Sequence, residues 1–387
     1  MTTGRPKTPA PPPRGQRATN ATIKQVALEA GVSVATVSRV LNDKGPASEA
    51  TRSRIRSVAE RLRYAPHGAA RSLITNRTNA LGVLLPDIYG EFFSEVIRGI
   101  DLASRGRGYH LLVSSSHGDR GEMEAVLRAT RGRVDGVIVM SPDLDTEMLH
   151  ANLPGTLPVV LLNCRSDGLG FDSITIDNYG GALAIVRHLA GFGHQRIALV
   201  KGPAGNFDAS ERLRGYRKAM LSLPCGWSEE LEIEGDFSEE SGALAGRRAL
   251  ALRPIPSAIF AANDSMAIGV LSALWDAGLR VPEDISLAGF DDIPISRFTA
   301  PPLSSVRVPI ADLGGRAVAR LFHAIASKNQ HRRCHETLPT TLVERCSCAA
   351  PGAAQGVARG TERTLGNGPG SNRRRRGRPP TRPKGGA

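Results

Sequence analysis

The stretch ATIKQVALEAGVSVATVSRVLN (residues 21–42) predicts two short helices joined by a tight turn. Thr22 and Gln25 have the spacing of a capping box, which begins a helix. Gly31 suits the left-handed backbone conformation that commonly ends one. Ser33 is placed to cap the second helix. Two short helices with a glycine-containing turn between them form the helix-turn-helix pattern.

The small domain around this pair is predicted to cover residues 21–65. In the second helix, expected over 34–41, Val37 and Leu41 are four residues apart and should both point inward. A third helix is expected over 49–62, where apolar residues at helical spacing would close a small core.

The formal net charge of +13 is unevenly distributed along the 387 residues. Residues 1–75 carry 13 basic side chains against four acidic ones, and residues 351–387 carry nine against one. The 275 residues between them hold 28 basic and 32 acidic side chains. The excess positive charge therefore lies at the two ends, as in a nearly neutral globular body with a polyanion-binding end.

Beyond a polar break at 76–79, apolar strands alternate with amphipathic helices up to about residue 345. Such alternation indicates parallel sheets covered on both faces, and the number of strands predicts an α/β core of two doubly wound parallel-sheet subdomains. Strands are expected at 80–85, 109–113, 136–140, 158–162, 173–176, 196–200, 230–233, 257–261 and 285–289. Helices are expected at 92–106, 121–132, 178–191, 209–222, 239–252, 264–277 and 309–327.

Length and composition argue against several classes of protein. With 41% hydrophobic residues, the chain can form two or three domains with at least one large core. No apolar run approaches the roughly 18 residues that a membrane span needs. Because the N-terminus is polar and proline-rich, without a secretory leader, we expect a cytoplasmic, nucleoid-associated protein.

The sequence also lacks metal-site spacing and catalytic motifs. Its five cysteines include only one C-x-C, at Cys346 and Cys348, which predicts reduced thiols and no zinc site. No G-x-S-x-G, P-loop, post-strand G-x-G-x-x-G or H-E-x-x-H motif occurs. Asp291 and Asp292 are adjacent, so on an extended strand end they would point opposite ways. We therefore expect no enzymatic activity, no metal and no cofactor.

Residues 21–42, together with RYAPHGAARSLIT (63–75), resemble the DNA-binding headpiece of the LacI family of bacterial transcription regulators. The run GVSVATVSRVLN (31–42) is highly specific to that family. The resemblance implies that the second helix lies in the major groove of an operator, and that a sensor core follows the N-terminal headpiece.

The same resemblance implies roles for single residues of the headpiece. The base-contacting positions fall on Val34 and Ala35, whose apolar side chains could touch a thymine methyl group, and on Arg39, which could reach guanine. Phosphate-contacting or capping positions fall on Thr22, Ser33, Thr36, Ser38 and Asn42.

Residues 66–74 match the hinge helix of the family. So short a helix is unstable alone in water, and in the family it folds when two copies pair in the minor groove. Ala70 lines the apolar side, and Leu73 aligns with the leucine wedged between central base pairs. The alternative for Leu73 is a buried linker residue.

The segment 80–345 resembles the periplasmic-binding-protein-like core of LacI-family regulators, with matches such as GHQRIALVKG (193–202) and AIFAANDSMAIGV (258–270). Two subdomains then face a cleft, and three chain crossings are expected near 175–178, 305–308 and 327–333. The implied N-subdomain is about 80–176 plus 307–328, and the C-subdomain about 177–306 plus 333–345.

The resemblance places the effector contacts of this cleft on particular residues. Arg212 matches an arginine that binds hydroxyls or carboxylates, and Asn263 and Asp291 match polar groups at strand ends. Asp264 and Asp292 are expected to be helix caps instead. The remaining contact positions are Asp87, Phe92, Phe93 and Asn163. Such a set suits a sugar or polyol best, with nucleobases or other small polar metabolites as alternatives.

The resemblance as a whole implies a repressor that binds a pseudo-palindromic operator as a homodimer, or as a dimer of dimers, under the control of a small effector. The alternative is a sugar-binding receptor of periplasmic type without DNA function. The arm 1–20 and the tail 350–387 are expected to be disordered. In the tail, RRRRGRPP (373–380) resembles an AT-hook, and a solubilising charged segment is the alternative.

Overall fold

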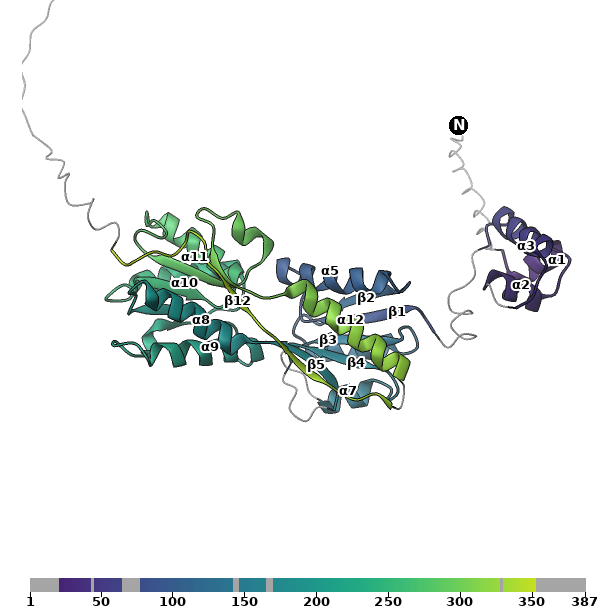
Figure 1. Cartoon of the computed structure of the whole chain (residues 1–387), viewed down its shortest axis with the longest axis horizontal. Helices are drawn as coiled ribbons and strands as arrows, with labels where there is room; N and C mark the ends of the chain where they lie inside the picture. Colours follow the sequence, from purple (N-terminus) through teal and green to yellow (C-terminus); the bar gives the residue numbers. More distant parts are fainter. Residues whose placement is uncertain are drawn as a thin grey trace, which may run out of the picture.

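The computed structural model describes residues 21–42, 45–64, 77–141, 146–164, 170–327 and 330–352. The arm 1–20, the hinge 66–74 with Ala70 and Leu73, and residues 353–387 lie outside this part of the chain. The described residues form a three-helix headpiece and a two-sheet α/β core (Figure 1). Within them, no helix is both long enough and apolar enough to cross a membrane.

The headpiece consists of α1 (Ile23–Glu29), α2 (Val34–Leu41) and α3 (Glu49–Arg61). The predicted capping box forms, because the Thr22 amide donates to Gln25 Oε1 at 2.7 Å and the Gln25 amide donates to Thr22 Oγ1 at 3.4 Å. Gly31 has a φ of +62°, so the turn between α1 and α2 requires the left-handed conformation that glycine adopts without strain.

The inward side of α2 differs from the prediction at one position. Val37 and Val40 are fully buried, whereas Leu41 is half-buried at the edge of the headpiece core. Residues three and four positions after Val37 lie on nearly the same side of a helix, and here α1 and α3 cover the side that carries Val40.

The N-subdomain has a parallel sheet with the strand order β11-β5-β4-β3-β1-β2. Its strands are β1 (Ala80–Leu85), β2 (His110–Ser115), β3 (Gly136–Met140), β4 (Val159–Leu162), β5 (Asp172–Ile176) and β11 (His335–Leu338). Helices α5 (Glu91–Arg105) and α12 (Ile310–Ser327) cover one face, and α6 (Arg120–Thr130) and α7 (Thr146–Asn152) cover the other. At Gly99 a Cβ would lie 2.0 Å from the Ala311 carbonyl oxygen, so glycine permits the close crossing of α5 and α12.

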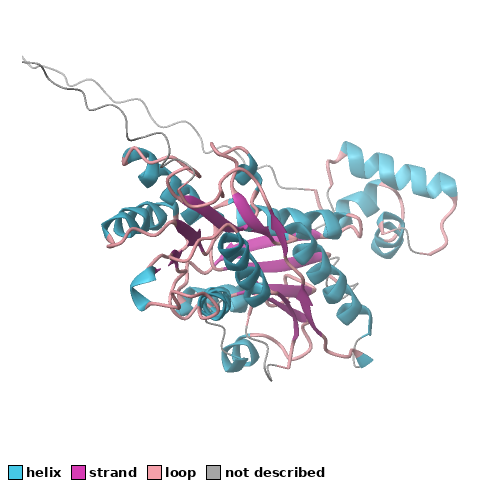
Figure 2. Cartoon of the chain, turned by 60° about the vertical axis from the view of Figure 1, so that its left-hand side comes forward, coloured by secondary structure: helices cyan, strands magenta, loops and turns pink. Residues whose placement is uncertain are grey.

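The C-subdomain repeats this architecture with the strand order β12-β10-β9-β8-β6-β7, and β12 runs antiparallel to β10. Its strands are β6 (Ile197–Val200), β7 (Glu232–Ile233), β8 (Ala258–Ala261), β9 (Ser286–Asp291), β10 (Ser304–Arg307) and β12 (Thr341–Val343). Helices α8 (Asn178–Gly191) and α9 (Phe207–Met220) pack together, as do α10 (Glu239–Ala251) and α11 (Asp264–Asp276), and short 3₁₀ turns are η1 (Glu229–Leu231) and η2 (Pro294–Arg297). Figure 2 shows strands enclosed between helices in this core.

A strand occurs at each of the nine predicted places, although the one predicted at 230–233 is reduced to Glu232–Ile233 because η1 occupies the residues before it. The seven predicted core helices are present, while β10, β11, β12 and α7 were not predicted. The third crossing was expected near 327–333, and this prediction is wrong. Residues 335–338 form β11, which pairs with β5 in the N-subdomain sheet, so the chain crosses only after Leu338. There the Asp177 amide donates to the Leu338 carbonyl at 2.9 Å, which joins two crossings side by side.

Candidate functional sites

The N-terminal turn of α2 presents apolar side chains to solvent. Val34 is 40% exposed, and Ala35 is exposed beside it. Arg39 is exposed one turn later, and its Nε donates to the Ala35 carbonyl at 3.3 Å, so the guanidinium lies close to this turn. The three predicted base-contacting residues therefore share one exposed side of the helix, with methyl groups next to a cation.

Three of the predicted phosphate-contacting residues, Thr22, Ser33 and Asn42, also cap the headpiece helices. Ser33 Oγ accepts from the Thr36 amide at 3.1 Å and lies 2.9 Å from Thr36 Oγ1. Asn42 Nδ2 donates to the Ser38 carbonyl at 2.7 Å. Because Thr22 and Ser33 are not buried, these hydroxyls stay within reach of solvent and of an anion while they cap.

The second site is a cavity of about 340 Å³ whose lining residues come from both subdomains. The geometry brings together all seven predicted effector-contacting residues, namely Asp87, Phe92, Phe93, Asn163, Arg212, Asn263 and Asp291. The cavity lies at the carboxyl ends of the strands, because Asp87 and Asn163 follow β1 and β4 while Asp291 ends β9. Parallel sheets generally bind ligands at this edge.

Arg212 is buried and fixed on three sides. Its Nε donates to Asn178 Oδ1 at 2.8 Å, one Nη donates to the Ala262 carbonyl at 2.5 Å, and the other donates to Asp291 Oδ1 at 3.0 Å. Its Cζ also lies 3.8 Å from the centre of the Phe290 ring. The guanidinium therefore has one preset orientation at the wall of the cavity.

Two carboxyl groups near Arg212 are perturbed. Burial raises the pKa of Asp291 to about 6, against the opposing charge of Arg212. Desolvation likewise raises the pKa of Asp208 to about 6, opposed by Arg212 and by the amide of Asn178, whose Nδ2 donates to Asp208 Oδ1 at 2.8 Å. Asn178 thus bridges Arg212 and Asp208 within one hydrogen-bonded network.

Asn163 supplies an unused acceptor. Asn163 is 5% exposed as a whole, and its side-chain oxygen Oδ1 is buried without a hydrogen-bond partner among the described residues. The backbone there has a φ of +48°, a conformation that asparagine tolerates better than most residues. A buried polar atom of this kind costs free energy while it lacks a donor, and Asn163 is one of the residues that line the cavity.

The neighbouring carboxylates do not act as helix caps, contrary to expectation. Asn263 caps α11, since its Oδ1 accepts from the Met266 amide at 2.9 Å. The fully buried Asp264 accepts instead from the Ile293 amide and from Ser296 Oγ and Ser305 Oγ. Asp292 accepts from two arginines, Arg307 at 2.7 Å and Arg345 at 2.5 Å. These two side chains serve to join separate segments of the C-subdomain.

The separation of Asp291 and Asp292 has a different origin from the predicted one. Both residues have positive φ, +103° and +53°, so the backbone leaves the regular extended conformation at the last residue of β9. Their carboxylates still reach different partners, Arg212 and Arg307 respectively.

Sequence reasoning missed part of the cavity wall, including Tyr89, Asp208, Asp236 and Phe237. Asp208 is one helical turn before Arg212, and this spacing was a usable signal. Phe237 has a φ of +75° in a loop, and no local pattern points to it. Among the described residues, no three His, Cys, Asp or Glu side chains come together as a metal site would require.

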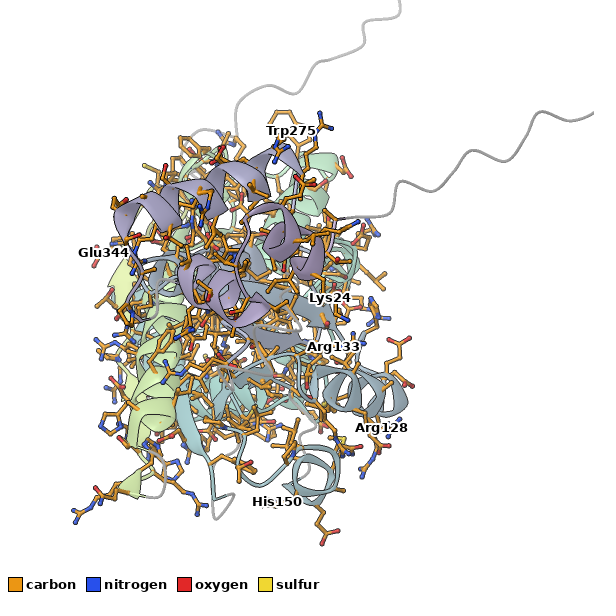
Figure 3. All side chains as sticks on the ribbon, turned by 90° about the vertical axis from the view of Figure 1, so that its right-hand side faces the viewer. Lys24, Arg128, Arg133, His150, Trp275 and Glu344 are labelled. Atoms are coloured by element: carbon orange, nitrogen blue, oxygen red, sulfur yellow. The ribbon has the colours of Figure 1, made fainter. Side chains whose placement is uncertain are left out.

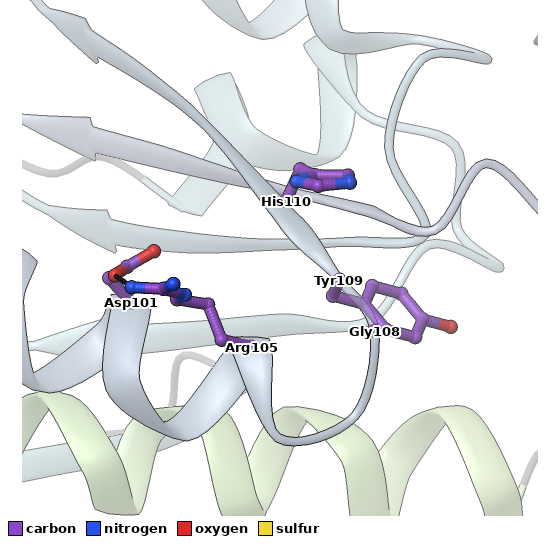
Figure 4. Close-up of a pocket in the computed structure, with 5 residues that line it drawn as sticks. All are labelled: Asp101, Arg105, Gly108, Tyr109 and His110. Carbon is purple, nitrogen blue, oxygen red and sulfur yellow. Dashed lines mark ion pairs between the residues drawn. The ribbon is translucent and has the colours of Figure 1, made fainter.

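A second hollow, of about 370 Å³, is lined by the end of α5, the loop that follows it and the start of β2, and it is open to solvent (Figure 4). Asp101 and Arg105 form an ion pair at its edge, 3.6 Å apart. None of the predicted effector residues lines it, so it takes no part in the cleft.

Comparison with known proteins agrees with both halves of the structure. Residues 22–67 match the model of bacterial regulatory proteins of the lacI family, and residues 186–348 match a periplasmic binding protein-like domain. The chain is 36% identical over 326 residues to the HTH-type transcriptional repressor PurR of Aliivibrio fischeri, covering 83% of this chain and 97% of that protein.

Solved structures show the same likeness. The lac repressor dimer bound to operator and the anti-inducer ONPF is 31% identical, with a TM-score of 0.76 over 86% of this chain and 100% of that chain. A LacI-family regulator from Enterococcus faecium with bound ribose is 27% identical, with a TM-score of 0.64 over 70% of this chain and 99% of that chain. The helix-turn-helix headpiece, the two-subdomain core and these relatives lead to one conclusion: the chain belongs to the LacI family and is a DNA-binding repressor with a ligand-binding core.

Proposed function

We propose that this repressor binds a pseudo-palindromic operator and that a neutral sugar or polyol in the cleft controls its affinity for DNA. A two-fold operator requires two headpieces, so the active form is a homodimer or a dimer of such dimers. Val34, Ala35 and Arg39 contact the bases of each half-site, and the capping hydroxyls of α1 and α2 contact the backbone.

The charge of the cavity supports a neutral effector. Among the residues that the structure describes, six carboxylates line it and Arg212 is the single cationic side chain. Arg212 already donates to three acceptors, so it neutralises its own surroundings and not an incoming anion. A phosphate or carboxylate would therefore meet uncompensated negative charge, whereas hydroxyl groups would find acceptors.

The unpartnered Oδ1 of Asn163 is the observation that carries the proposal, because a ligand hydroxyl that reached it would supply the donor that no described residue supplies. Phe92 and Phe93, whose ring centres are 5.6 Å apart, offer apolar surface for the C–H face of a sugar ring. Binding between two subdomains joined by crossing strands would shift one against the other, and a coupling of about 1–3 kcal/mol changes operator affinity roughly 5- to 150-fold.

The test begins with selection of bound duplexes from a random library by the full-length protein, followed by mobility shift on the enriched sequence. Ribose and ribose 5-phosphate form a matched pair, and xylitol, adenosine and guanine extend the panel. We expect an enriched inverted repeat whose affinity changes with a neutral hydroxylated compound and not with its phosphate ester. The sign of the change distinguishes induction from corepression.

Two results would contradict the proposal separately. The absence of any enriched sequence would overturn operator recognition by this headpiece. A response only to anionic compounds, or only to bases without a sugar, would overturn the effector class and leave operator recognition intact.

A further inference from the structure

We propose that the face of the N-subdomain on which its parallel strands begin is a second DNA-contact surface, which binds backbone phosphates beside the operator. The name strand-start face is used here for the described segments 77–79, 105–109, 128–135 and 330–334, which precede four of the six strands of this sheet, β1, β2, β3 and β11. Because parallel strands all run in one direction, these segments meet at one edge of the sheet, opposite the effector cleft. The inference rests on the proposed operator binding.

The strand-start face concentrates positive charge in a core that has none in excess. The core has 28 basic and 32 acidic side chains over residues 76–350, yet these four segments contain eight arginines and one acidic residue. The acidic residue, Asp135, is occupied by the Thr78 and Asn79 amides at 2.7 and 3.0 Å. The arginines are Arg77, Arg105, Arg107, Arg128, Arg131, Arg133, Arg332 and Arg333.

Four of these arginines interact with other parts of the N-subdomain, and these interactions explain their presence. Arg105 and Arg128 lie in the last turns of α5 and α6, where a cation is favourable at the helix end. Arg131 Nε donates to the Asn152 carbonyl at 2.7 Å, and Arg107 lies over the Phe322 ring at 4.5 Å. These contacts hold the loops of the face together.

Three arginines have no such role. Arg133, Arg332 and Arg333 lie outside the helices, are exposed, and form no ion pair with any residue that the structure describes. Figure 3, which turns the right-hand side of Figure 1 toward the viewer, labels Arg133 together with Arg128. Exposed guanidinium groups without carboxylate partners are suited to bind phosphate oxygens, with two parallel hydrogen bonds each.

The tether identifies DNA as the partner. The chain reaches the core from the headpiece at this face, because Arg77 and β1 come next after the segment that links them to Tyr64. The 12 residues between Tyr64 and Arg77 span at most about 45 Å when extended, so DNA held by the headpiece stays within that reach. The phosphates that flank the operator are therefore the nearest polyanion.

The test compares two variants of the full-length protein that each lose three exposed positive charges. The face variant is Arg133→Gln with Arg332→Gln and Arg333→Gln. The control variant is Lys218→Gln with Arg247→Gln and Arg248→Gln, on exposed helix surfaces of the C-subdomain. Affinity is measured across a salt series on the selected operator alone, and on the operator extended by about 10 base pairs, one helical turn, at each end.

We expect the face variant to bind the operator alone with the same affinity as the wild type. This measurement also tests operator binding separately from the flanking contact. On the extended duplex the face variant should bind more weakly, and the slope of log K against log salt should become shallower by about 0.9 for each phosphate that the variant no longer neutralises. The control variant should match the wild type on both duplexes. Arg→Lys at the same three positions should restore most of the slope, since lysine keeps the charge.

Three outcomes would overturn the inference. The first is that the face and control variants bind the extended duplex with equal affinity. The second is that the face variant loses the same affinity on both duplexes. The third is that the face variant has a changed oligomeric state in the absence of DNA. The last outcome would assign the face to contacts between copies of this chain.

Discussion

The carboxylate of Glu91 accepts a hydrogen bond from the backbone amide of Ile295 across the effector cleft, at 2.8 Å. Glu91 is the first residue of α5 in the N-subdomain, and Ile295 lies in η2 of the C-subdomain. The contact joins the two rims of the cleft without passing through the crossing strands. It is therefore a direct link between the subdomains whose relative position an effector would change.

Glu91→Ala should release this link and weaken effector binding about fivefold, because a partly exposed charged hydrogen bond contributes on the order of 1 kcal/mol. Since Glu91 also lines the cavity, the decisive measurement is hydrogen exchange without effector, in which the Ile295 amide should lose protection. The control is Glu95→Ala on the next turn of α5, where the carboxylate pairs with Arg98 in the same helix. Unchanged protection at Ile295 would show that the cleft closes independently of Glu91.

Short-range patterns predicted the structure where a few neighbouring residues suffice. The cap at Ser33 and the capping box at Thr22 form as expected, because the donor and acceptor are three residues apart. The cleft residues could also be predicted, since parallel topology brings strand ends such as Asp87 and Asp291 to one edge.

Long-range pairing could not be predicted in the same way. The segment HETL of β11 is mostly polar and largely unburied, and it is a strand only because β5, far away in the sequence, pairs with it. Asp264 resembles a helix cap in sequence, but Ser296 and Ser305 from distant segments bind its carboxylate. A single sequence does not show which distant segments will pair with a strand or donate hydrogen bonds to a side chain.

Arg212→Lys should lower effector affinity at least about tenfold while operator binding without effector persists. Lysine keeps the charge beside Asp291 but cannot reproduce the fixed fork that also reaches Asn178 and Ala262. Isothermal calorimetry with the effector found in the panel measures the first effect, and mobility shift the second. Arg214→Lys, an exposed position on the same helix, is the matched control. An affinity within about twofold of the wild type would remove Arg212 from the binding site.

Asp264 should make stability depend on pH near neutrality. Burial, and then the charge of Asp291, raises the pKa of Asp264 to about 7, whereas aspartate in an unfolded chain has a pKa of about 3.9. Between these values the folded state holds a proton that the unfolded state lacks, so the contribution of Asp264 to folding improves as pH falls from about 8 to 5.5.

Asp264→Asn removes this titration, so the stability of the wild type relative to the variant should rise by on the order of 1–2 kcal/mol over that interval. Thermal unfolding at both pH values measures the difference. Asp284→Asn is the control. Hydrogen bonds with Arg280 lower the pKa of Asp284, so the stabilisation that Asp284 gives is lost only at pH values below 5.5. A pH-independent gap between wild type and Asp264→Asn would mean that Asp264 stays ionised.

Arg39→Ala should relax base preference at one position of each half-site. A bidentate contact to guanine discriminates by about 1–3 kcal/mol, so the variant should bind duplexes with the other bases there nearly as well as the selected operator. Affinities for four operator duplexes that differ only at that base pair measure the effect. Arg54→Ala, on the exposed side of α3, removes the same charge and should keep the preference. If Arg39→Ala instead weakened binding equally for all four duplexes, Arg39 would be a backbone contact, and base recognition would be left to the methyl groups of Val34 and Ala35.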